Sequence, residues 1–246
     1  MKKELIVLTL FLSNIFYCYS NTVSFPTINN FISNSYKDTT FILKEKDSSY
    51  YHKIYIEKNR KSNYYKLLTN FKFSKGDLEF INEYYKLFKK RSAPVKKFNL
   101  QNIVKEWLPL YKYKDKYYLY APSDWGNRKM ITNSLLFYWY LDGPYPCILT
   151  SFSKINLNHY KLTSKDFFDN SDVYVKPAKL SIYIIDLKKN ISVWKYWNKK
   201  GEYRYGLFVS KEHAKAFDIV VNYCKESKVP EFDFDKIDFK KLLNEK

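Results

Sequence analysis

The stretch from Leu180 to Val209 reads LSIYIIDLKKNISVWKYWNKKGEYRYGLFV, and it carries the clearest architectural signal in the chain. Segments rich in β-branched and aromatic residues alternate here with short polar breaks that are typical of turns. The pattern predicts strands over Leu180–Leu187, Ile191–Trp197 and Tyr203–Val209. Consecutive strands joined by short turns form an antiparallel meander.

Apolar residues at helical spacing follow this meander directly. Ser210 is a suitable N-cap, and the apolar face after it would comprise Ala214, Phe217, Val220, Val221 and Cys224. This spacing predicts a helix over 211–227, and a second, short helix is expected to begin at Asp235. Because strands and helices are grouped in the sequence, the predicted fold class is α+β, with a mainly antiparallel sheet and flanking helices.

The chain before the meander contains segments with the periodicity of strands and segments with the periodicity of helices. Phe41–Leu43 with Tyr50–Ile56 predicts one hairpin, and Tyr111–Lys114 with Tyr117–Tyr120 predicts another around Asp115-Lys116. Leu135–Tyr140 is expected to be an aromatic strand.

A helix is predicted over 76–91. Ser74 and Asp77 have the three-residue spacing of a capping box, in which each side chain accepts a hydrogen bond from the other residue's backbone N–H. Ser92-Ala93-Pro94 follows as the best internal boundary. The expected parts are therefore 21–98 and 99–246, with one continuous domain over 21–246 as the open alternative.

The first twenty residues have the composition of an export signal. Two lysines and a glutamate precede an apolar run from Leu5 to Phe16, and small residues follow at Cys18 and Ser20. The run is too short to span a bilayer, which takes about 20 residues. We expect residues 1–20 to be a signal peptide, no membrane span after its removal, and a secreted or periplasmic protein. A retained anchor and a lipid anchor through Cys18 are the alternatives.

The net charge and the cysteines each allow more than one interpretation. The formal net charge is +18, but four of the 43 basic residues are arginine, so there is no specific nucleic-acid signature. Codon bias is an alternative source of the lysines and tyrosines. In an oxidising compartment, Cys147 and Cys224 could form a disulfide, or Cys224 could be a buried helix residue.

Known catalytic and metal-binding motifs are missing from the sequence. The three histidines, His52, His159 and His213, lack the spacing of a metal site, and neither a cofactor nor catalytic residues are predicted. Asp233, Asp235 and Asp238 lack the glycine and terminal glutamate of a calcium loop, so capping explains them better.

The most distinctive local pattern is YYLYAPSDWGNR at positions 117–128. A strand with Tyr118 and Tyr120 leads into a loop that presents a carboxylate, an indole, an amide and a guanidinium. The candidate ligand-binding residues are therefore Tyr118, Tyr120, Asp124, Trp125, Asn127 and Arg128. Ordinary turn chemistry is the alternative explanation of the loop. Trp139, Trp194 and Trp197 are further candidates for a stacking platform, although Trp194 and Trp197 must lie on opposite faces of one strand.

These features favour an exported, non-catalytic binding or cell-envelope accessory protein. Its expected ligand is an extended, hydroxylated or anionic polymer such as a polysaccharide. One alternative is a secreted hydrolase that uses carboxylates such as Asp124 and Asp142 as acid and base. A purely structural or protein-interaction protein of the envelope is the other.

Overall fold

The computed structural model describes residues 39–46, 51–91, 95–100, 103–121, 127–140, 143–165, 178–197, 203–224 and 232–245. They belong to a single compact unit, Asp38–Lys246. The predicted signal peptide lies outside these residues, so export stays a prediction.

Eight of the described strands form a closed antiparallel barrel. In the order of their pairing they are β3 (Glu106–Tyr113), β11 (Tyr203–Ser210), β10 (Ile191–Trp197), β9 (Ala178–Asp186), β8 (His159–Lys165), β7 (Gly143–Asn156), β6 (Leu135–Tyr140) and β5 (Arg128–Ile131). β5 then pairs with β3, with Glu106 opposite Met130 and Trp107 opposite Lys129, and this contact closes the ring.

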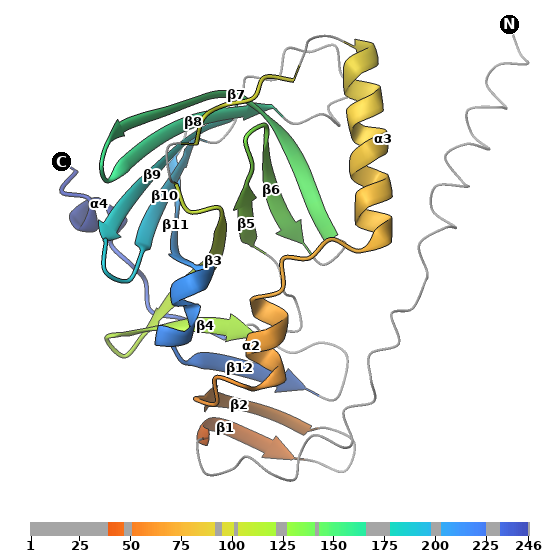
Figure 1. The fold of residues 1–246 in the computed structure, drawn as a ribbon. Coiled ribbons are helices and arrows are strands. Elements are labelled where there is room, and N and C mark those ends of the chain that lie inside the picture. The colour runs from red at the N-terminus through yellow and green to blue at the C-terminus, as the bar shows by residue number, and fades with distance from the viewer. Residues whose placement is uncertain are drawn as a thin grey trace, which may run out of the picture. The chain divides into compact units, whose positions relative to one another are not determined.

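A second sheet region extends from the barrel because β3 pairs again further along its length. Its residues Tyr111–Tyr113 pair with β4 (Lys116–Ala121). β4 is parallel to β12 (Ile219–Cys224), which pairs with β2 (Tyr51–Glu57), and β2 pairs with β1 (Thr39–Lys46). In the view of Figure 1 these strands lie below the barrel.

The described helices are short apart from one. They are α2 (Asn63–Leu68), α3 (Lys75–Arg91), the 3-10 helix η3 (Lys211–Ala216) and α4 (Phe239–Leu242). Ile81 and Tyr84 of α3 contribute to a cluster with barrel residues such as Phe137. Figure 1 shows α3 as a long helix beside the barrel.

Successive side chains along the barrel strands point to opposite faces and form two separate hydrophobic clusters. Side chains from all eight barrel strands, among them Trp107, Leu136 and Ile182, form the interior cluster. The opposite faces of β3, β5, β6, β7, β10 and β11 contribute to a second cluster, which includes residues of α2 and α3. Trp194 and Phe208 meet inside at 5.0 Å between ring centroids. Gly206 makes room for them, since a Cβ there would lie 2.7 Å from the Phe208 ring.

The predicted fold class is wrong. The sheet closes into an eight-stranded barrel, and in the described part of the chain α3 is the only helix longer than six residues, so there is no helical layer of an α+β fold. The largest single error is the helix expected over 211–227. After η3 the chain turns extended at Phe217 and forms β12. The β-branched run Ile219-Val220-Val221 favours a strand, and the edges of β2 and β4 supply its backbone partners.

Most of the local predictions are confirmed. The meander is β9–β10–β11, and both hairpins form, although the second turns at Lys114-Asp115, one residue earlier than expected. The capping box also forms: Ser74 N donates to Asp77 Oδ2 at 2.7 Å, and Asp77 N donates to Ser74 Oγ at 3.1 Å. Local signals therefore located these elements correctly.

One barrel strand carries a lysine on its inner face. Lys129 of β5 lies opposite Trp107 on one side and Tyr138 on the other, and it is 4% exposed. Its Nζ is 4.3 Å from the centroid of the Tyr138 ring and 6.0 Å from that of Phe208. Burial lowers the pKa of Lys129 to about 7, because the charged form loses its hydration.

Replacing Lys129 by methionine should therefore change how stability depends on pH. Between about pH 7 and about pH 10.5, Lys129 is protonated in the unfolded chain and mostly deprotonated in the folded chain. Because the unfolded state binds more protons, Lys129 makes the stability of the wild type rise with pH in this range. From about pH 7 to about pH 9 the wild type should gain roughly 2 kcal/mol relative to Lys129→Met in urea unfolding. Lys188→Met, at an exposed turn, is the control and should keep the wild-type slope. Parallel pH profiles for the wild type and Lys129→Met would contradict a buried amine.

Candidate functional site

The candidate residues of the 117–128 segment separate in the structure. Asp124 and Trp125 lie outside the described residues, as does Asp142. Asn127 is exposed in a turn with a φ of 76°, and its N–H donates to the Trp139 carbonyl at 2.9 Å.

Tyr118 and Tyr120 are buried in an aromatic cluster of the second sheet region. The Tyr120 hydroxyl accepts hydrogen bonds from Asn222 Nδ2 and from the backbone N–H of Phe232, each at 3.1 Å. The tyrosines are therefore packed between β4, β12 and the C-terminal segment. They belong to a different cluster from Phe71 and Trp139, the two rings that Arg128 contacts.

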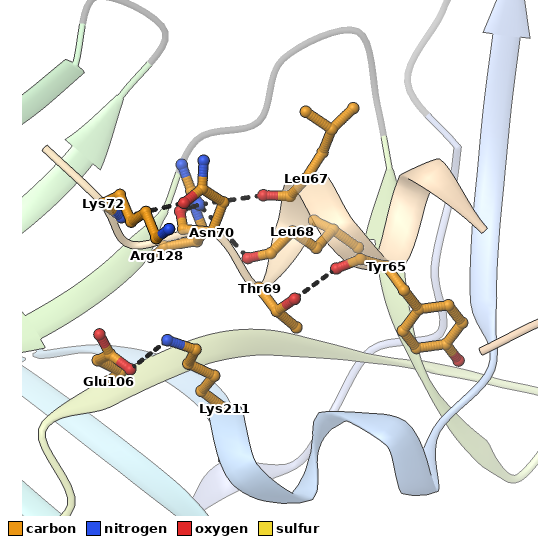
Figure 2. A network of polar contacts seen from close by, with 9 residues as sticks. All are labelled: Tyr65, Leu67, Leu68, Thr69, Asn70, Lys72, Glu106, Arg128 and Lys211. Carbon is orange, nitrogen blue, oxygen red and sulfur yellow. Dashed lines mark hydrogen bonds and ion pairs between the residues drawn. The ribbon is translucent and has the colours of Figure 1, made fainter. Parts of the chain in front are cut away.

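Arg128 is directed at the end of helix α2 (Figure 2). Its Nη1 donates to the carbonyl oxygens of Leu67 at 3.3 Å and Leu68 at 3.4 Å, and also to that of Asn70. The guanidinium lies 5.2 Å from the Phe71 ring centroid and 5.3 Å from that of Trp139. Burial lowers its pKa to about 10, so it stays charged at neutral pH and complements the negative end of the helix dipole.

This placement gives Arg128 a structural role that can be separated from ligand binding. Arg128→Met should remove the guanidinium donor from three carbonyl groups, of which that of Leu67 keeps the Asn70 N–H at 3.1 Å. The substitution should lower the free energy of unfolding in urea by roughly 2–4 kcal/mol. Arg204→Met, at an exposed position, should change it by less than about 0.5 kcal/mol. A variant at 128 that kept full stability but lost polymer binding would instead identify Arg128 as a ligand-binding residue.

The other candidates from the sequence take local structural positions. Cys147 is a buried thiol, and the side chain of Cys224 lies outside the description, so their disulfide stays a prediction. Asp238 caps α4 by accepting from Lys241 N at 3.0 Å, and Asp235 accepts from Lys114 N at 2.7 Å.

The histidines lie on separate elements and have different surroundings. His52 bonds Asn222 at 2.7 Å, His213 bonds Ser210 at 2.8 Å, and His159 stacks on Tyr183 at 4.2 Å between ring centroids. Among the described residues there is no group of three or more histidine, cysteine, aspartate or glutamate side chains that could hold a metal ion.

A groove of about 530 Å³ lies on the outer face of the barrel, across strands β7 to β11. Leu162 and Leu180 belong to the interior cluster, so the alternating residues Lys161, Thr163, Lys179 and Ser181 face outward. Further lining residues are Ser151, Ser153, Tyr183, Lys195, Trp197 and Tyr203. The surface thus combines ammonium groups, hydroxyls and aromatic rings.

Strand register arranges these side chains in a row across the sheet. Ser153 of β7 lies opposite Lys161 of β8, which lies opposite Ser181 of β9, and the row continues to Lys195 of β10 and Tyr205 of β11. Five strands at 4.7–4.9 Å spacing make this row about 19 Å long. Lysines alternate with hydroxyls along it, which suits an extended ligand that runs across the strands.

Exposed aromatic rings mark one end of the groove. Trp197 is 40% exposed and Tyr203 is 50% exposed, and their rings are perpendicular at 4.8 Å between centroids. Trp194 and Trp139, the other tryptophans considered for stacking, are buried at 0% and 5% exposure. Of the three, Trp197 is therefore the one whose ring is available to a ligand.

The charge of the groove is positive. Lys161 and Lys179 are exposed, and the described lining residues include no aspartate or glutamate. Lys195 is more buried, with its side chain 16% exposed, and it forms an ion pair with Glu245 at 2.7 Å. An anion that entered this groove would meet ammonium groups and no like charge among the described lining residues.

Sequence reasoning named Trp197 and missed the lysines and hydroxyls beside it. The signal was present as alternation: in Tyr160–Lys165 and Lys179–Tyr183, polar residues occupy every second position. The grouping of these positions on one surface depends on the register between strands, which the sequence does not state.

No protein-family model, curated protein or solved structure matches the chain. Within the described residues, no helix is both long enough and apolar enough to cross a membrane.

Proposed function

We propose that this chain is an exported, non-catalytic binding protein whose ligand is an acidic polysaccharide held in the groove of β7 to β11. The observation that carries the proposal is the row of lysines and hydroxyls, with the exposed rings of Trp197 and Tyr203 beside its β10–β11 end. Export rests on the composition of residues 1–20.

Each component of the groove matches a component of such a polymer. Lysine ammonium groups attract acidic groups, and the hydroxyls of Ser151, Ser181 and Thr163 can exchange hydrogen bonds with sugar hydroxyls. The Trp197 ring offers a flat apolar surface on which the less polar face of a sugar ring can stack. A sheet surface about 19 Å wide accommodates several consecutive units of an extended chain.

A polysaccharide explains the groove better than a nucleic acid does. The groove is lined by lysine and contains no arginine among its described residues, whereas phosphate and base-edge recognition relies on the arginine fork. Binding of nucleic acid in preference to acidic polysaccharide would therefore overturn the proposed ligand class.

Binding should depend on both the ring and the lysines. With polygalacturonate as the probe, Trp197→Ala should weaken binding about tenfold in titration calorimetry, because stacking on an exposed ring contributes about 1–3 kcal/mol. Lys161→Ala/Lys179→Ala should weaken it by a similar factor at about 0.05 M salt, and by much less at about 0.5 M salt.

Lys188→Ala/Lys189→Ala is the matched control. It removes the same charge from an exposed turn between β9 and β10 and should leave the affinity within about twofold of wild type. Equal losses in both lysine pairs would attribute binding to net charge alone. Full binding by Trp197→Ala would exclude the groove as the site.

A further inference from the structure

A carboxylate of the chain itself lies beside the groove and pairs with one of its lining lysines. Lys195 Nζ donates to both carboxylate oxygens of Glu245, at 2.7 and 2.8 Å, and the Tyr205 hydroxyl donates to Glu245 Oε2 at 3.1 Å. Lys195 also lines the groove, where its Nζ is 4.1 Å from the centroid of the Tyr203 ring. One ammonium group and one phenol thus hold a planar anion at the aromatic end of the groove.

The electrostatics show that this position stabilises a negative charge. The hydrogen bonds from Lys195 lower the pKa of Glu245 and outweigh its partial desolvation, which acts in the opposite direction. Burial by itself would lower the pKa of Lys195, but the hydrogen bond and charge of Glu245 raise it overall. Lys195 is therefore kept fully charged by a carboxylate partner.

Glu245 belongs to the C-terminal segment that follows α4. That segment is attached through the stacked rings of Phe239 and Tyr205, whose centroids are 5.4 Å apart. Because α4 ends at Leu242, Glu245 lies beyond the helix, and displacement of its carboxylate does not require the helix to unwind.

We infer that Lys195 and Tyr205 form a carboxylate subsite, that the acidic groups of the ligand are carboxylates of the uronic-acid type, and that Glu245 occupies the subsite until the polymer displaces it. This inference rests on the proposed function, since it assigns a chemistry to one end of the same groove. A sulfated polymer carries a tetrahedral anion in place of the planar carboxylate and is expected to bind this subsite less well.

The test compares the binding of two polymers by the wild type and by variants of Glu245, with Glu212→Gln as the control. Glu245→Gln removes the internal competitor, so its affinity for polygalacturonate should rise about fivefold, with a gain of less than about twofold for dextran sulfate. Glu212→Gln removes the same charge from the exposed side of η3 and should leave both affinities unchanged. A chain that ends at Asn244 should reproduce the Glu245→Gln result and keeps the test valid if that variant folds poorly.

The outcomes separate this inference from the proposed function. If the wild type binds polygalacturonate and removal of Glu245 brings no gain, or an equal gain for both polymers, the carboxylate subsite is wrong and the groove proposal stands. If neither the wild type nor the Glu245 variants bind either polymer, both proposals are wrong. A matching loss of affinity in Lys195→Met, with and without Glu245, would support the subsite.

Discussion

Strand β3 pairs with β5 through two residue positions, Glu106 with Met130 and Trp107 with Lys129, and this short contact closes the barrel. Closure removes the exposed edges that an open sheet would leave and gives every barrel strand an inner and an outer face. The interior then fills with large side chains such as Trp107 and Trp194, which are both fully buried. The outer face becomes a continuous curved surface, and the groove lies on it.

Strand β5 also carries two adjacent buried basic residues. Arg128 and Lys129 point to opposite faces of the strand, so one reaches the carbonyl groups at the end of α2 and the other enters the barrel. Arg128 donates to carbonyl oxygens, whereas the Lys129 amine lies 4.3 Å from the centroid of the Tyr138 ring. Their lowered pKa values reflect the same desolvation in two different surroundings.

The groove and the C-terminal segment are coupled through Lys195. This residue is paired in the sheet with Ser181 and Tyr205, lines the groove, and holds Glu245 from a region about fifty residues away in the sequence. Barrel residues therefore line the groove, and an acidic group of the C-terminal segment pairs with one of them. The strands of the barrel fix the spacing of these charges.

The sequence by itself determined the elements that depend on neighbouring residues. The capping box of Ser74 and Asp77, the hairpins and the meander follow from contacts a few positions apart, and local chemistry is sufficient to specify them. Only the tertiary structure decided that Ile219–Cys224 is a strand, since its partners on β2 and β4 are distant in the chain. Closure of the barrel and the grouping of Lys161, Lys195 and Trp197 likewise depend on the register between strands, because that register sets which alternate residues share a face.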